Sequence, residues 1–154
     1  MSGELGLFEV VAEAFRGLVD PGLGQVGIRW HGYGVKVWFG SDDTNREHYE
    51  AQVVNARLVD EASVLALEIG FHAEHRTLAE NDAVLDRLLV AESRWRPAVG
   101  DDAVAGEFIG RPDLWRRVSE VWPDPDLGDP DLALDLALRL NDYVDALEPV
   151  LRST

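Results

Sequence analysis

Residues 48–75 read HYEAQVVNARLVDEASVLALEIGFHAEH, and this stretch predicts two paired β-strands. Apolar and polar residues alternate over 48–54 and again over 65–74, as they do where successive side chains point to opposite faces of a sheet. The connection over 55–63 is shorter than the crossover that parallel strands need. The two strands are therefore expected to be antiparallel neighbours, each with one apolar face and one polar face.

The chain before this stretch predicts one helix and one hairpin. Apolar residues recur at helical spacing until the helix-breaking residues 20–22, so an amphipathic helix should end near Val19. Residues 25–39 are rich in β-branched and aromatic side chains. A glycine-containing turn in their middle predicts a hairpin with strands near 25–31 and 34–39.

The chain after the two strands predicts a second helix. Thr77 and Glu80 have the spacing of a capping box, in which each side chain satisfies a free N–H group at a helix start. An apolar stripe follows, and Pro97 and Gly100 are expected to close it. The helix is expected to run over about 78–95.

The C-terminal third predicts a strand or short helix and then a strong helix. Residues 113–122 fit either element, and a strand after a loop is preferred. The last helix is expected to begin at Pro130 with Asp129 as its N-cap. Leucines at every second position from Leu132 to Leu140 spread around most of its circumference. Some of them need a cover, either the N-terminal helix or a second copy of the chain.

Together these elements predict an α+β fold. A length of 154 residues with 46% hydrophobic residues suits a single domain, residues 1–154, with one core. The expected architecture is an antiparallel sheet of four to five strands, with three or more helices packed mainly on one face.

The composition excludes several classes of function. Twenty-nine acidic against fourteen basic residues give a net charge of -15, which repels nucleic-acid backbones and anionic membrane surfaces. Cysteine is absent, so thiol nucleophiles, thiolate metal sites and disulfides are excluded. The N-terminus has no basic region before its apolar residues, so no signal peptide is expected. These features predict a cytoplasmic protein that binds neither nucleic acid nor membrane.

Histidines and carboxylates fall on the polar faces of the two central strands and suggest a metal site. Imidazole and carboxylate groups are suitable ligands for zinc and other divalent ions. The alternative is that these residues form the solvated face of a half-buried sheet, and no spaced ligand motif such as HExxH is present. The candidate ligands are His48, Glu50, Glu68, His72 and Glu74.

A second possible site resembles the carboxylate sets that hold magnesium in nucleases. It would use Asp42, Asp43, Glu50 and Gln52. The only lysine, Lys36, lies a strand away and lacks the spacing of restriction-type nucleases.

Trp38 shares a strand face with Lys36, so this tryptophan could lie on the polar face of the sheet. An aromatic side chain there suggests a bound partner or a covering helix, and an incidental surface tryptophan is the alternative. Trp38 and Gln52 are therefore the candidate binding residues.

The order of elements also resembles a known group of proteins. The segments FHAEHRTLAENDAVLDRLL, WRRVSEVW and DALEPVL follow one another over roughly the last hundred residues. In this order the chain is similar to small bacterial α+β domains of unknown function that occur beside restriction-type modules. The resemblance implies a bacterial origin and no particular catalytic residues.

From these observations we expect an interaction module that binds a protein partner or itself as a homodimer, without a cofactor. The alternative is a metal-dependent, nuclease-like hydrolase that uses a divalent metal on the histidine and carboxylate face.

Overall fold

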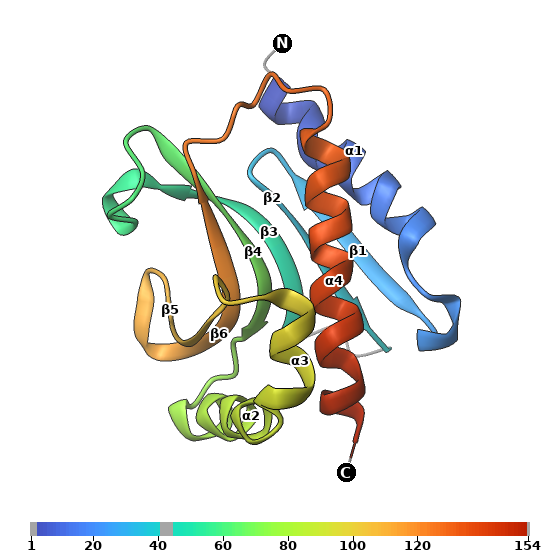
Figure 1. Cartoon of the computed structure of the whole chain (residues 1–154), viewed down its shortest axis with the longest axis vertical. Helices are drawn as coiled ribbons and strands as arrows, with labels where there is room; N and C mark the ends of the chain where they lie inside the picture. The colour runs from blue at the N-terminus through green and yellow to red at the C-terminus, as the bar shows by residue number, and fades with distance from the viewer. Residues whose placement is uncertain (1–2, 41–44, 154) are drawn as a thin grey trace.

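The computed structural model describes residues 3–40 and 45–153, and these form four α-helices and one six-stranded antiparallel sheet (Figure 1). The strands are β1 (Val26–His31), β2 (Gly34–Phe39), β3 (Glu47–Asn55), β4 (Leu65–Ala73), β5 (Val104–Phe108) and β6 (Arg111–Pro123). The helices are α1 (Gly3–Leu18), α2 (Leu78–Val90), α3 (Glu92–Val99) and α4 (Leu132–Arg152). The expected α+β class with an antiparallel sheet is confirmed, and the sheet has six strands rather than four to five.

The strand order is β1-β2-β3-β4-β6-β5, so β3 and β4 lie at the centre of the sheet. Their register places His48 opposite His72 and Glu50 opposite Gly70. The other neighbour of β4 is β6, because the β5–β6 hairpin pairs with β4 through its second strand. Residues 113–122, which could have been helix or strand, lie within β6.

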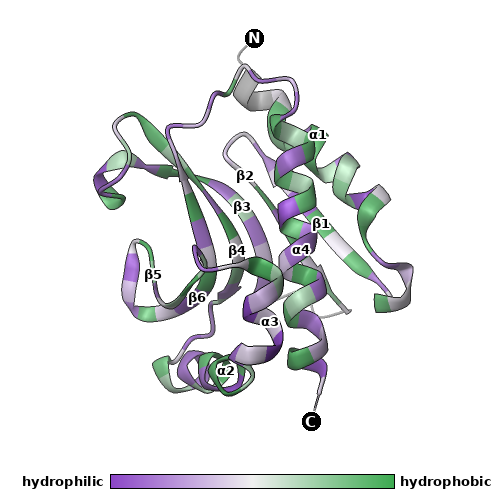
Figure 2. Cartoon of the chain, in the orientation of Figure 1, coloured by the Kyte–Doolittle hydropathy of each residue, from purple (hydrophilic) through white to green (hydrophobic). Residues whose placement is uncertain are grey.

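One face of the sheet packs against the helices. Hydrophilic and hydrophobic residues alternate along the central strands, as Figure 2 shows. Tyr49, Phe71 and Val118 belong to one core with buried residues from all four helices. Because this core takes one side chain of every two, the intervening polar residues of β3, β4 and β6 lie on the opposite face of the sheet.

The leucines of α4 are covered in part by α1. The two helices run beside each other over the sheet (Figure 1). Leu132, Leu136 and Leu140 are buried, whereas Leu134 and Leu138 stay 51% and 43% exposed. The N-terminal helix therefore packs over part of the leucine stripe. Self-association through the exposed leucines stays a prediction. No described helix combines the length and apolar character that a membrane crossing needs.

The helix expected over about 78–95 is two helices. Its start is confirmed, since the Thr77 side chain accepts the N–H of Glu80. The chain then leaves helical geometry at Ala91 and starts again in α3, which buries Trp95 completely and lets its indole N–H donate to the carbonyl of Leu88. Pro97 lies inside α3 and does not close it.

The start of the last helix was also placed too early. The helix α4 begins at Leu132 rather than Pro130. The carboxylate of Asp129 accepts the N–H of Asp131 over 2.9 Å, which forms a turn before the helix instead of a cap on it.

Candidate metal centre

Polar residues of neighbouring strands lie in register on the sheet face opposite the helices. In one row, His48 of β3 lies opposite His72 of β4, which in turn lies opposite Arg117 of β6. Residues two positions along a strand point to the same face. The neighbouring row, Lys36, Glu50, Gly70 and Ser119, therefore brings three further polar side chains beside the histidines and leaves a gap at the glycine.

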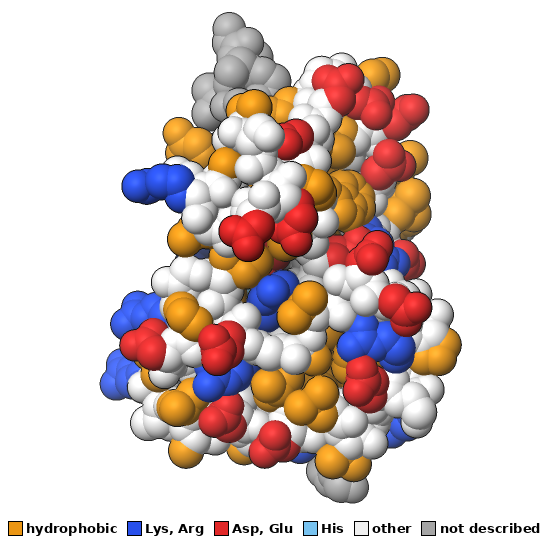
Figure 3. Space-filling model, turned by 60° about the vertical axis from the view of Figure 1, so that its left-hand side comes forward, with side chains coloured by type: hydrophobic (Ala, Val, Ile, Leu, Met, Phe, Trp, Pro, Cys, Tyr) orange, Lys and Arg blue, Asp and Glu red, His pale blue; other side chains and the backbone are white. Residues whose placement is uncertain are grey.

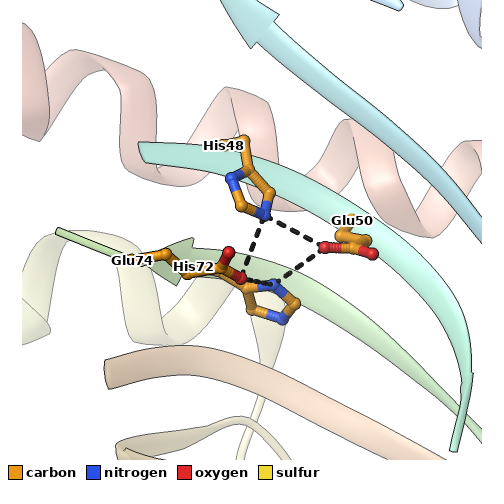
Figure 4. A group of neighbouring side chains, drawn as sticks. All are labelled: His48, Glu50, His72 and Glu74. Atoms are coloured by element: carbon orange, nitrogen blue, oxygen red, sulfur yellow. Dashed lines mark hydrogen bonds and ion pairs between the residues drawn. The ribbon is translucent and has the colours of Figure 1, made fainter. Parts of the chain in front are cut away.

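Four side chains of this face meet in a closed ring of ligand atoms (Figure 4). The Nε2 atom of His48 lies 3.0 Å from Oε1 of Glu50 and 3.3 Å from Oε2 of Glu74. The Nδ1 atom of His72 lies 3.2 Å from the same Glu50 oxygen and 3.3 Å from the same Glu74 oxygen. Nitrogen and oxygen therefore alternate around the ring, and all four atoms lie within 4.8 Å of one another.

The sides of the ring have the length that a metal site requires. Zinc bonds to imidazole nitrogen or carboxylate oxygen are about 2.0 Å long, so neighbouring ligands of a tetrahedral zinc ion lie about 3.3 Å apart. Two imidazoles and two carboxylates form a mixed donor set that suits zinc and other first-row divalent metals. The four sides of the ring thus match one ion, and for a tetrahedral ion its two diagonals, which reach up to 4.8 Å, have to shorten to about the same length.

Each histidine of the ring is held by a hydrogen bond at its other nitrogen. The Nδ1 atom of His48 lies 2.8 Å from the carbonyl oxygen of Asn45, and the Nε2 atom of His72 lies 2.8 Å from Oε2 of Glu68. A carbonyl or carboxylate in this position receives the ring N–H and turns the other nitrogen toward the ion. This arrangement is the usual outer support of a histidine metal ligand.

Glu68 is itself held by residues of the two strands beside β4. The hydroxyl of Ser119 donates to Oε2 of Glu68 over 2.6 Å, and the side-chain amide of Gln52 donates to Oε1 over 2.8 Å. Arg117 in turn donates to the Ser119 hydroxyl over 2.9 Å. The carboxylate that orients His72 is therefore fixed from β3 and β6.

Burial and hydrogen bonding together determine the protonation of the ring. Burial by itself would lower the pKa of His72, but Glu68, Glu50 and Glu74 raise it well above its usual value. Burial by itself would raise the pKa of Glu50, but hydrogen bonds from His48 and His72 lower it. The same balance lowers the pKa of Glu74 to about 2. The carboxylates are thus anionic at neutral pH, as metal ligands must be, whereas His72 carries a proton that it has to release when an ion binds.

Gly70 allows β4 and β6 to approach closely beside the ring. A Cβ atom built on it would lie 2.3 Å from the carbonyl oxygen of Val118 and 2.5 Å from Cα of Ser119. Its φ of 154° is also one that other residues rarely adopt. The missing side chain is what leaves room for Ser119 next to Glu68.

The structure brings together all five of the predicted ligands, although their roles differ. Glu50, Glu74 and the two histidines form the ring, whereas Glu68 supports His72 from outside it. The alternative of a solvated face is wrong here, because His48, His72 and Glu68 have relative exposures of 1% or less. The two histidines of the ring are thus buried, whereas Glu74 is half-buried and lies nearer the surface.

The predicted binding residues separate. Gln52 belongs to the centre through its bond to Glu68. Trp38 does not belong to the centre. Its ring lies over Gly27 of the edge strand β1 and stacks with the guanidinium of Arg29. Of the magnesium set, Asp42 and Asp43 lie outside the described residues.

Several residues around the centre had no signal in the sequence. Ser119 and Arg117 reach it only because β6 pairs with β4. The ring of Phe108 packs edge-on against the imidazole of His72, with centroids 4.6 Å apart, and Trp115 packs against Phe108. The β5–β6 hairpin thus forms an aromatic wall beside the candidate metal centre.

A pocket of about 300 Å³ opens beside the ring. Glu50 and Glu74 are among its lining residues, whereas the two histidines lie behind them. Its other walls come from β2, from the loop after β3 and from the β5–β6 hairpin. An ion held by the ring would therefore be approached from the carboxylate side.

The molecular surface carries charges of both signs. On the face displayed in Figure 3, acidic side chains are interspersed with arginines and with hydrophobic side chains. The net charge of -15 is thus spread over the surface rather than offset by one large basic patch on that face.

No family model, curated protein or solved structure matches this chain.

Proposed function

We propose that this protein binds one divalent transition-metal ion at His48, Glu50, His72 and Glu74 and uses it in the hydrolysis of a small substrate. The observation that supports the proposal most is the closed ring of two nitrogens and two oxygens with sides of 3.0 to 3.3 Å. The outer hydrogen bond of each histidine adds to this support.

The charges of the centre also favour an ion. Three buried or largely buried carboxylates face two imidazoles on this part of the sheet. Buried carboxylates are costly unless they are paired or bound to a metal. The rival explanation is a network of ion pairs in which protonated histidines replace the metal. That network would serve only to stabilise the fold.

The neighbouring pocket supports a chemical role for the ion. Catalytic sites keep a position on the ion that a substrate can reach, so beyond its four protein ligands the ion needs a fifth position that faces the pocket. The pocket reaches the ring at Glu50 and Glu74, and the two histidines anchor it from behind. When bound, a divalent ion supplies Lewis acidity to a group in the pocket. The protein supplies the orientation and the exclusion of bulk water.

A small substrate fits this site better than a polynucleotide. A volume of about 300 Å³ is at the low end of the range for small-molecule pockets. A net charge of -15 also opposes the approach of a phosphate backbone. We therefore propose a hydrolase of small molecules rather than a nuclease.

Metal analysis of protein purified without an affinity tag tests the first part of the proposal. We expect one ion per chain in protein exposed to zinc, manganese or cobalt. His48→Gln should lose it, and His75→Gln should keep it because His75 lies outside the ring and pairs with Glu47 instead. Folded protein that takes up none of these metals would overturn the proposal and favour the ion-pair network.

Hydrolysis of chromogenic substrates tests the second part. The metal-loaded protein should cleave at least one of p-nitrophenyl acetate, p-nitrophenyl phosphate and bis-p-nitrophenyl phosphate. Removal of the metal by a chelator should abolish this activity, and added metal should restore it. Metal binding without turnover of any of the three would leave a metal-binding protein and contradict the hydrolase.

A further inference from the structure

The pocket beside the metal centre has two chemically different sides. Its polar side carries Lys36 and Gln52 together with the ring residues Glu50 and Glu74. Its apolar side is formed by the end of β3, the loop that follows it and the β5–β6 hairpin: Val54, Leu58, Phe108, Ile109 and Trp115. A ligand that fills the pocket must therefore carry a polar group and an apolar group at opposite ends.

Lys36 is the residue of the polar side that is free to bind a ligand. It lies opposite Glu50 in the β2–β3 register and is half-buried. Within residues 3–40 and 45–153, no hydrogen bond or ion pair involves its side chain. It is also the only lysine among 154 residues that carry a net charge of -15. Its ammonium group is open to water and lines the pocket, so it is available to pair with an anion that enters.

The apolar side of the pocket contacts the proposed metal centre directly, through a ring contact with His72. The ring of Phe108 lies edge-on to the imidazole of His72, and the ring of Trp115 lies edge-on to Phe108 at 5.4 Å. The guanidinium of Arg111 covers Trp115 at 4.9 Å from the ring centroid. These contacts hold the aromatic rings in one orientation, so the wall is preformed for an apolar group.

We propose that the pocket binds a small organic anion, with its anionic group between Lys36 and the metal and its apolar group against the wall of Trp115 and Ile109. This inference rests on the metal centre proposed above. One divalent ion, Lys36 and Arg117 carry four positive charges against the three carboxylates of Glu50, Glu68 and Glu74. A ligand anion therefore meets a site that is not negative although the whole chain is acidic.

Isothermal titration of the metal-loaded full-length chain tests this inference. The probes are phenylphosphonate and phenylacetate, with benzyl alcohol and methylphosphonate as controls that lack the anionic or the aromatic part. At least one aromatic anion should bind about ten-fold or more tightly than both controls. The comparison of the two anions shows whether the site selects a phosphonate or a carboxylate.

Variants of the lysine separate its role from that of the metal. Lys36→Gln should weaken binding of the preferred anion about ten-fold or more, and Lys36→Arg should restore most of it, while metal content stays at one ion per chain. Arg16→Gln makes the same change in net charge on an exposed position of α1, in the helix layer on the opposite face, and should change nothing.

The two proposals fail in different ways. The anion pocket would be overturned, and the metal centre left intact, if the metal-loaded protein bound benzyl alcohol as tightly as the anions. The same holds if Lys36→Gln left the affinity for the anion unchanged. Protein that takes up no metal would overturn both.

Discussion

The Nε2 atom of His72 lies 2.8 Å from Oε2 of Glu68, while Nδ1 of the same ring faces Glu50 and Glu74. The two residues are four positions apart on β4, so their side chains lie on the same face of the strand. One nitrogen is thus held by the protein and the other is directed into the ring of ligand atoms. The proposed metal site therefore depends on a residue that is not itself in the ring.

Glu68→Gln should weaken metal binding by about 10-fold to 100-fold, because an amide holds the imidazole less firmly than a carboxylate. The side chain keeps its size, so the circular dichroism spectrum should stay that of the parent. Competition with a chromogenic chelator measures the affinity. Glu61→Gln, on an exposed loop, is the control for the loss of one charge. Equal affinities in the parent and Glu68→Gln would contradict the role of Glu68.

Gly70→Ala should lower the free energy of unfolding by at least about 2 kcal/mol, because the new Cβ would meet the backbone of β6 at 2.3 Å. Gly106→Ala is the matched control, since this glycine lies in β5 with nothing within 4 Å of its Cβ position. Urea unfolding measures both variants. Similar midpoints for the two would show that β4 and β6 can separate at this point without cost.

The sequence predicted the central strands well because their information is local. Alternation over 48–54 and 65–74 gives the faces, and a short connection gives the antiparallel pairing that brings His48 opposite His72. The hydrogen bond from Ser119 to Glu68 spans 51 positions and depends on β6 pairing with β4. The short edge strand β5 has a glycine at its centre and no alternating pattern, so neither this strand nor the aromatic wall could be predicted.

Helix boundaries were harder to predict than the helices themselves, because tertiary contacts decide them. The stripe over 78–95 looks continuous in sequence, but the helix breaks at Ala91, and beyond the break Trp95 is fully buried and donates to the carbonyl of Leu88. The helix α4 starts later than predicted, because Asp129 makes a local turn with Asp131. In both cases the preference of a single residue competes with packing or with a neighbouring backbone group.

Thr77→Ala should destabilise the fold by about 1 kcal/mol, because α2 loses the side-chain oxygen that accepts the N–H of Glu80. Thr77→Ser keeps this oxygen and should unfold close to the parent. Thermal melts followed by circular dichroism compare the three proteins. A Thr77→Ala protein that melts with the parent would show that the cap adds nothing to stability.

Self-association through α4 is expected to use Leu134 and Leu138, which lie one helical turn apart and stay exposed. Salt should strengthen it, because a charge of -15 on each chain opposes contact at low ionic strength. Sedimentation velocity at low and high salt measures the effect, and Leu134→Glu should abolish it. A sharp monomer at micromolar concentration under both conditions would refute the dimer.

Glu120 forms a polar network on the helix side of the sheet, away from the metal centre. Its Oε1 atom accepts from Arg139 over 2.8 Å and from the hydroxyl of Tyr143 over 2.7 Å, and its Oε2 atom accepts from the indole of Trp122 over 2.7 Å. Burial raises the pKa of this carboxyl, but the hydrogen bonds lower it below its usual value. The folded protein therefore favours the ionised form more than the unfolded chain does.

This difference predicts a stability that depends on pH. A carboxyl whose pKa is lower in the folded state stabilises the protein above its unfolded pKa, about 4.3, and loses this contribution as the pH falls through the folded value. Glu120→Gln should therefore lower the free energy of unfolding by about 1.5–3 kcal/mol at pH 7, the range for hydrogen bonds to a charged group. The gap between parent and variant should narrow toward pH 3.

Urea unfolding with a chelator present measures this gap at pH 7, 5 and 3 without interference from the metal centre. Other carboxyls titrate over the same range in both proteins, so the difference between parent and Glu120→Gln isolates Glu120. Glu9→Gln, exposed on α1, should match the parent at each pH. A gap that stayed constant from pH 7 to pH 3 would show that packing of the side chain, rather than its charge, accounts for the stability that Glu120 provides.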